Sequence, residues 1–230
     1  MSENLQAPYG YANVAQASDT QRVLRNTYWL LALSLVPTVL GAWIGVATGL
    51  FAAMSPGISM LVFFVGAFGL MFVVEKTKDS AMGVVALLGF TFFMGLMLSR
   101  LVGHVLGYKN GTSLVMTAFG GTAAIFFTMA TLATVIKRDL SSMGKFLMVG
   151  AVILMVAGIA NFFLQSSALM LTILVLVLAV FSAFMLYDIK RVIDGGETNY
   201  ISATLAIYLD IYNVFQSLLS LLGIFGGDRD

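Results

Sequence analysis

Residues 146–188 read FLMVGAVILMVAGIANFFLQSSALMLTILVLVLAVFSAFMLYD, and Asp188 is the first charged residue of this stretch. A helix needs about 20 predominantly apolar residues to cross the hydrocarbon core of a bilayer. The stretch is long enough for two such helices, and the polar residues Gln165-Ser166-Ser167 separate them. It therefore predicts two membrane-spanning helices, near 145–164 and 168–189, that are joined by a tight turn.

Charges and turn residues divide the rest of the chain in the same way. The run from Thr27 to Val74 has no charge and is too long for one span, and Ser55-Pro56-Gly57 divides it. We expect spans at 27–51, 58–74, 81–100, 112–136, 145–164, 168–189 and 200–225. The predicted fold is an all-α integral membrane protein, with a seven-helix transmembrane domain over residues 27–225. Residues 1–26 are polar and turn-rich, which predicts a flexible tail.

Composition supports a membrane protein and excludes several other classes. The chain has 230 residues, of which 60% are hydrophobic and 10% are charged, whereas a soluble domain carries about 25% charged residues. The net charge of +1 gives no reason to expect a nucleic-acid partner. The chain has one histidine and no cysteine, so disulfides are excluded and we expect no resident cofactor of the zinc or haem type.

The distribution of positive charge predicts the orientation, because cytoplasmic loops carry an excess of lysine and arginine. With the N-terminus in the cytoplasm, nine basic residues flank the inner ends of the spans and two flank the outer ends. The inner residues are Arg22, Arg25, Lys76, Lys78, Lys137, Arg138, Lys145, Lys190 and Arg191, and the outer ones are Arg100 and Lys109. The last segment is open to two interpretations, a full crossing or a re-entrant fold.

Two acidic residues lie where the chain should be surrounded by apolar groups. Asp188 ends the run quoted above, and Asp210 is the only charge between Thr198 and Gly227. Intramembrane acids are costly and usually face a bundle interior or an ion path. At 1.5 Å per residue, Asp188 lies roughly 8 Å and Asp210 roughly 15 Å from the shared inner end of the last two spans. We expect these two residues, the aspartate pair, to meet.

An aspartate pair of this kind would hold one proton and titrate as a unit. Its four oxygens also suit a hard cation, which makes calcium the candidate ligand, in competition with protons. Asn213 follows Asp210 by three residues and shares its helix face, so it is a candidate to solvate the pair. Two structural alternatives stay open, an interfacial ion pair of Asp188 with Lys190 or Arg191, and a buried structural hydrogen bond for Asp210.

Weaker signals lie at other polar and small residues. Arg100 and His104 either line an outer vestibule or extend their polar ends to the membrane interface. Gly41, Gly45 and Gly49 recur every four residues and so share one helix face, which favours close helix packing.

No motif supports catalysis, so we expect a protein that is not an enzyme. The sequence has no glycine-rich phosphate loop, nucleophile elbow or His-Glu-x-x-His pattern. Intramembrane aspartyl proteases also use two aspartates, and Tyr187-Asp188 resembles one of their motifs. Their second motif, Gly-x-Gly-Asp, is missing, because Ile207-Tyr208-Leu209 precedes Asp210.

Several stretches resemble the Bax inhibitor 1 family, also called the transmembrane Bax-inhibitor-motif proteins. These are Leu186-Tyr187-Asp188, the segment from Tyr208 to Phe215, and Val23-Leu24-Arg25-Asn26-Thr27-Tyr28 before the first span. The chain is most similar to bacterial inner-membrane members of the modulator-of-FtsH type. The resemblance implies a C-terminal helix that is central in the bundle, and a multi-pass location in the bacterial inner membrane.

The resemblance also implies a pH-sensitive calcium leak, with the closed state held by an aspartyl pair that maps onto Asp188 and Asp210. Some members have an arginine in the second span that holds one aspartate. Residues Ile58 to Val74 contain no basic residue, so gating is expected to differ here.

The sequence therefore supports two hypotheses about function. The first is a pH-sensitive calcium leak channel, whose partners are calcium, protons and the lipid bilayer. The second is a regulator or slow substrate of a membrane-anchored ATP-dependent protease, for which the cytoplasmic tail would be the handle.

Overall fold

The structure, a computed structural model, describes residues 8–227, and it describes side chains from residue 19 onward. This part of the chain forms seven α-helices and no strand. The helices are α1 (Pro8–Thr48), α2 (Pro56–Thr77), α3 (Ala81–Leu106), α4 (Gly111–Val135), α5 (Ser141–Leu164), α6 (Ser167–Ile193) and α7 (Tyr200–Gly226). Each contains an apolar segment long enough to cross a membrane. The predicted all-α integral membrane protein with seven transmembrane helices is therefore confirmed, and several helices extend about one turn beyond their expected ends.

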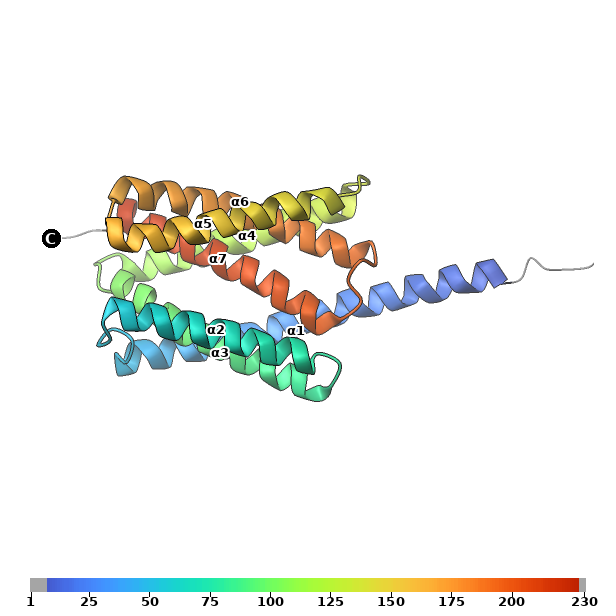
Figure 1. Cartoon of the computed structure of the whole chain (residues 1–230), viewed down its shortest axis with the longest axis horizontal. Helices are drawn as coiled ribbons and strands as arrows, with labels where there is room; N and C mark the ends of the chain where they lie inside the picture. The colour runs from blue at the N-terminus through green and yellow to red at the C-terminus, as the bar shows by residue number, and fades with distance from the viewer. Residues whose placement is uncertain (1–7, 228–230) are drawn as a thin grey trace, which may run out of the picture.

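The first helix is longer than the expected first span. Residues 8–26, the described part of the expected tail, are helical and continue without a break into the span. Pro8 is compatible with this because proline is tolerated in the first turn of a helix. Figure 1 shows that the beginning of α1 projects beyond the bundle, at the end opposite the C-terminus. The flexible cytoplasmic tail stays a prediction.

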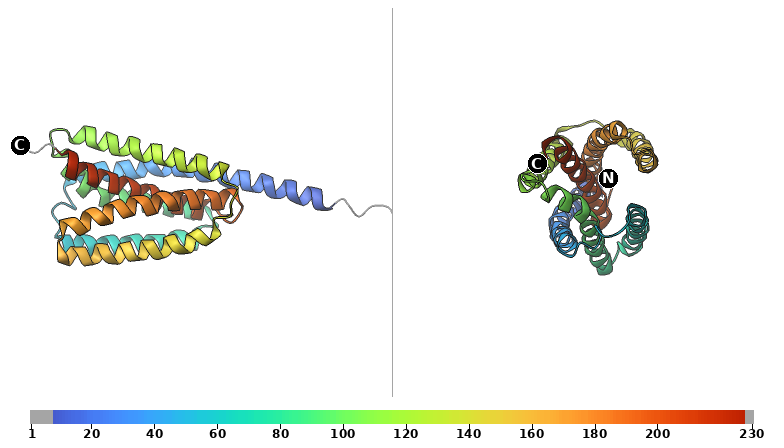
Figure 2. Two further views of the ribbon diagram at one scale, coloured as in Figure 1. Left: turned by 90° about the horizontal axis from the view of Figure 1, so that it is seen from above. Right: turned by 90° about the vertical axis from the view of Figure 1, so that its left-hand side faces the viewer.

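α7 is the central helix of the bundle. It packs against α1, α2, α3, α4 and α6, and Figure 2 shows other helices arranged around it. Ile207, Val214 and Leu219 on α7 are completely buried. α7 is also continuous over 27 residues, so the last segment runs through the bundle and does not fold back.

The outer surface of the bundle is apolar. Large side chains on the peripheral helices are exposed, among them Trp29, Trp43, Phe72, Phe146 and Phe163. In water such a surface would be unfavourable, whereas in a bilayer it contacts lipid chains. The exposed aromatic side chains therefore belong to the membrane-facing side of the fold.

Glycines bring α1 and α3 into close contact. A Cβ atom on Gly41 would lie 2.2 Å from the Phe92 carbonyl oxygen, and one on Gly95 would lie 2.1 Å from the Thr38 carbonyl oxygen. A Cβ atom on Gly45 would likewise meet the Ser99 side chain. Gly49 has a different role, because it adopts a φ of +64° just after the end of α1, with nothing near its Cβ position.

Hydrogen bonds hold α7 at both ends. At its start, the Asn199 side chain accepts the backbone N–H groups of Ile201 and Ser202, and its Nδ2 donates to the Lys78 carbonyl oxygen at 3.2 Å. At its other end, Nδ2 of Asn110 donates to the Gly226 carbonyl oxygen at 2.6 Å. The turns on either side of α3 therefore fix the central helix.

Candidate functional site

The aspartate pair meets between α6 and α7. Asp188 lies five residues before the end of α6, and Asp210 lies ten residues after the start of α7. The two carboxyl groups lie close enough to interact directly. A hydrogen bond between them requires a proton on one of the two groups, because an ionised carboxylate only accepts hydrogen bonds. The structure thus brings the two predicted site residues together, while their role in ion or proton sensing stays a prediction.

Asp210 is the more deeply buried member of the pair. It is only 3% exposed, and its Oδ2 atom is buried without a hydrogen-bond partner. Asp188 is partly buried. A buried polar atom without a partner is costly, so the site contains an acceptor that a proton, water or cation can satisfy.

The short connection between α6 and α7 makes this contact possible. Asp194 follows the end of α6, and Gly195 turns the chain with a φ of +75°, which is favourable only for glycine and a few other residues. Asn199 then caps α7. Because only a few residues join the two helices, they must run antiparallel as neighbours, which places the two aspartates at similar depths.

The charges near Asp188 are engaged elsewhere. Lys190 forms an ion pair with Asp194, and Arg191 forms one with Glu197 at 3.2 Å. Among the described residues Asp188 forms no ion pair of its own, although the charges of Arg191 and Glu197 act on it. The interfacial ion pair considered for Asp188 is therefore not formed, and its side-chain partner is Asp210.

Asn213 does not complete the pair in this structure. Its Nδ2 donates to the Leu209 carbonyl oxygen of its own helix at 2.8 Å. The amide is thus used within α7, and the expectation that it solvates Asp210 gains no support from this geometry.

Tyr208 links α7 to its neighbours beside the pair. Its hydroxyl is 2.8 Å from Oγ1 of Thr38 on α1 and 3.4 Å from the Thr91 carbonyl oxygen on α3. The side chain is buried. Its position on the far side of the helix from Asp210 indicates that it anchors α7 and leaves the Asp210 face turned toward α6.

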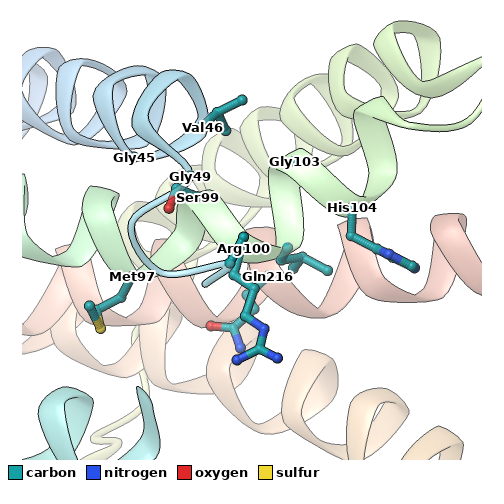
Figure 3. A pocket seen from close by; sticks show the side chains of 11 residues that line it. Gly45, Val46, Gly49, Met97, Ser99, Arg100, Gly103, His104 and Gln216 are labelled. Carbon is teal, nitrogen blue, oxygen red and sulfur yellow. The ribbon is translucent and has the colours of Figure 1, made fainter. Parts of the chain in front are cut away.

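A cavity of 790 Å³ opens at the end of the bundle where α1 ends. Arg100 and His104 of α3 line it together with Gln216 of α7, as Figure 3 shows. Arg100 also donates to the Ser59 hydroxyl at 3.3 Å, and His104 shares a hydrogen bond with Tyr108. Arg100 and His104 therefore line a cavity, and an outer vestibule stays a prediction. Gln216 was not predicted from the sequence, where its only signal is an amide within an apolar helix.

The aspartate pair lies between this cavity and a second one. Gln216 is six residues beyond Asp210, or about 9 Å along α7. The second cavity, of 560 Å³, lies at the opposite end of the bundle and is lined by Tyr187, which directly precedes Asp188. Neither cavity is lined by Asp188 or Asp210 themselves.

The site offers few ligands to a metal ion. In the part of the chain that the structure describes, no group of three or more histidine, cysteine or acidic side chains is placed to hold a metal. The pair supplies two carboxyl groups, fewer than the six to eight oxygen ligands that a tightly bound calcium takes. A cation at this position would need water or backbone carbonyl oxygens to complete its coordination.

Comparison with known sequences gives a consistent result. The profile of a family described as "Inhibitor of apoptosis-promoting Bax1" matches residues 20–227. A protein of Escherichia coli K12 named "Modulator of FtsH protease YccA" is 37% identical over 209 residues, which cover 91% of this chain and 93% of that protein. The same protein from E. coli O6:H1 is named "Inner membrane protein YccA", with the same identity and coverage. An "Uncharacterized membrane protein" of Vibrio cholerae is 37% identical over 93% of this chain and 94% of its own length.

Proposed function

Because this chain belongs to the Bax inhibitor family, we propose that it is a pH-sensitive cation leak channel for calcium, gated by Asp188 and Asp210. The observation that carries this proposal is the direct approach of the two carboxyl groups on adjacent helices, where Asp210 is buried and one of its oxygens bonds to no described protein atom.

Protonation would control whether α6 stays against α7. With one shared proton the two carboxyl groups attract each other, and without it they repel as like charges in a poorly solvated site. A second proton also changes the pair, because it removes the charged acceptor. α7 is fixed at both ends by Asn199 and Asn110, so α6 is the helix that would move.

A site that binds a cation only weakly is compatible with a leak channel. Conduction requires binding strong enough for entry and weak enough for exit. Two carboxyl groups, with no third acid among the described residues placed to hold the same ion, meet that requirement, whereas a complete oxygen cage would retain calcium. α2 contributes no basic side chain between Ile58 and Val74, so Arg191 on α6 is the cation that acts on Asp188. Gating would therefore depend on α6 and not on an arginine of α2.

The proposed location is the inner membrane of a bacterium, with the N-terminus in the cytoplasm. The names of the relatives support the location, and the nine-to-two bias of basic residues supports the orientation. The cavity beside Tyr187 would then face the cytoplasm, and the one beside Arg100 would face outward. The family and the relatives' names further suggest a modulator or a channel-like protein in preference to an enzyme.

A second function, regulation of or slow degradation by a membrane-anchored ATP-dependent protease, is favoured by a separate observation. The beginning of α1 projects beyond the bundle at the end that carries the α6–α7 connection. That end is the proposed cytoplasmic one, where such a protease would engage a substrate. The name of the E. coli relative points to the same kind of partner.

The decisive experiment for the channel is calcium entry into liposomes that contain the purified full chain, measured with an internal dye at several pH values. The proposal requires entry above that of empty liposomes and a dependence on pH. Liposomes with the protein that stay as tight as empty ones would reject the channel. Co-purification with the protease, and the lifetime of the protein in cells with and without it, test the second function independently.

A further inference from the structure

The cavity at the α6–α7 connection end has a basic lining. It lies between the α4–α5 connection and the last turns of α6 and has a volume of 560 Å³. Four basic side chains line it, Lys137, Arg138, Lys190 and Arg191, together with the carboxylates of Asp139 and Asp194. The excess of positive charge comes from two segments far apart in the sequence.

Both carboxylates in the lining are already engaged. Asp194 pairs with Lys190. Asp139 accepts the backbone N–H of Ser141 at 2.8 Å, and the Ser141 hydroxyl as well. These two contacts, made to the first residue of α5, hold the pKa of Asp139 below its ordinary value. Both carboxylates therefore carry their charge, and four cations against two carboxylates leave the lining positive.

Lys137 and Arg138 are the two cations of the lining that form no ion pair with a described side chain. Both are exposed, and Asp139 follows them in the chain. They follow the end of α4 by two and three residues, just beyond a segment long enough and apolar enough to cross a membrane. An arginine offers planar paired donors and a lysine a point charge, a combination that binds phosphate oxygens.

We propose that this cavity binds a phosphate group, with Lys137 and Arg138 as its main ligands and Lys190 and Arg191 as its inner wall. Basic pockets between membrane helices on the cytoplasmic side hold anionic lipid headgroups by the same physics. A phospholipid headgroup and a soluble phosphate share the recognised chemistry, and the experiment separates them. Tyr187 lines the cavity and directly precedes Asp188. Phosphate binding in the cavity does not, however, depend on the channel proposal.

The test measures binding to the full chain in detergent by native mass spectrometry. The probes are dioctanoyl phosphatidylglycerol, dioctanoyl phosphatidylcholine and inorganic phosphate. We expect the anionic lipid to bind more tightly than the zwitterionic one. Lys137→Gln with Arg138→Gln should weaken that binding on the order of tenfold, since each basic group near an anionic surface contributes measurably.

Matched variants distinguish binding at this cavity from non-specific attraction of anionic lipids to positive charge. Arg22→Gln with Arg25→Gln removes two exposed cations from the same end of the bundle and should leave binding nearly unchanged. Arg138→Lys keeps the charge and should retain most of the binding. Unchanged thermal melting of each variant in detergent excludes misfolding as the cause of a loss.

Each outcome decides the proposal. Anionic-lipid binding that depends on Lys137 and Arg138, and that inorganic phosphate does not displace, assigns the site to a lipid headgroup. Inorganic phosphate that binds or competes with the same dependence assigns it to a soluble phosphate. No preference between the two lipids together with no phosphate binding, or an equal loss in the Arg22 and Arg25 variant, would overturn the proposal.

Discussion

The carboxyl groups of Asp188 on α6 and Asp210 on α7 interact directly, because the chain turns back on itself between them. The contact joins the central helix to α6, which packs along it and is connected to it by a short turn. Asp210 contributes one further buried oxygen without a partner. Under the proposed function, this contact would couple protonation of the pair to the packing of two helices.

The close contact of α1 and α3 predicts an asymmetric response to alanine at two glycines of α3. Gly95→Ala should destabilise the protein by roughly 1–3 kcal/mol, because its Cβ would overlap the Thr38 carbonyl oxygen. Gly89→Ala is the matched control, since nothing lies within 4 Å of its Cβ position, and it should be neutral or slightly stabilising. Thermal unfolding in detergent measures both. Equal melting temperatures would contradict the packing described here.

The cap of α7 predicts a second loss of stability. Asn199→Ala removes the acceptor for two backbone N–H groups and a donor to the α2–α3 turn, and caps of this kind contribute about 0.5–2 kcal/mol. Ser80→Ala is the comparison, because Ser80 occupies the cap position of α3 without a side-chain cap bond. In chemical unfolding, Asn199→Ala should have a lower free energy of unfolding than Ser80→Ala. The opposite order would contradict a stabilising cap at Asn199.

The projecting part of α1 predicts a separation of the two proposed functions. Deletion of residues 2–18 should leave calcium flux intact, because the first buried side chain of α1 that is described is Thr27. The same deletion should lengthen the lifetime of the protein in cells that contain the membrane protease. Flux lost together with folded protein would instead show that the segment supports the bundle.

The membrane helices and the aspartate pair could be predicted from the sequence, because both depend on local signals. Uncharged runs of sufficient length mark the spans, and a short connection makes α6 and α7 antiparallel neighbours. The depth of Asp188 and Asp210 then follows from counting residues. Counting residues could not show whether the last segment crosses fully, because that depends on how it packs in the bundle. It also could not show that α1 begins before the membrane span, because the helix propensity of that segment is weak.

The cavities and the use of individual polar groups could not be predicted. Asn213 shares a face with Asp210, yet its amide bonds to its own helix, and a helix-wheel argument cannot distinguish these outcomes. Gln216 and Tyr187 line cavities only because distant helices meet beside them. Lys137 and Arg138 likewise signal orientation in the sequence, and only the fold places them beside Lys190 and Arg191.

The pH dependence of calcium entry in Asp210→Asn liposomes tests the central claim most directly. Asparagine keeps the shape and one acceptor but cannot exchange a proton or repel Asp188. Flux through the wild-type protein should change between about pH 5 and pH 8, and the variant should lose most of that change while its maximum is less affected. Asp19→Asn, which removes an exposed acid outside the pair, should follow the wild type. Superimposable pH profiles of wild type and Asp210→Asn, at equal protein incorporation, would contradict gating by the aspartate pair.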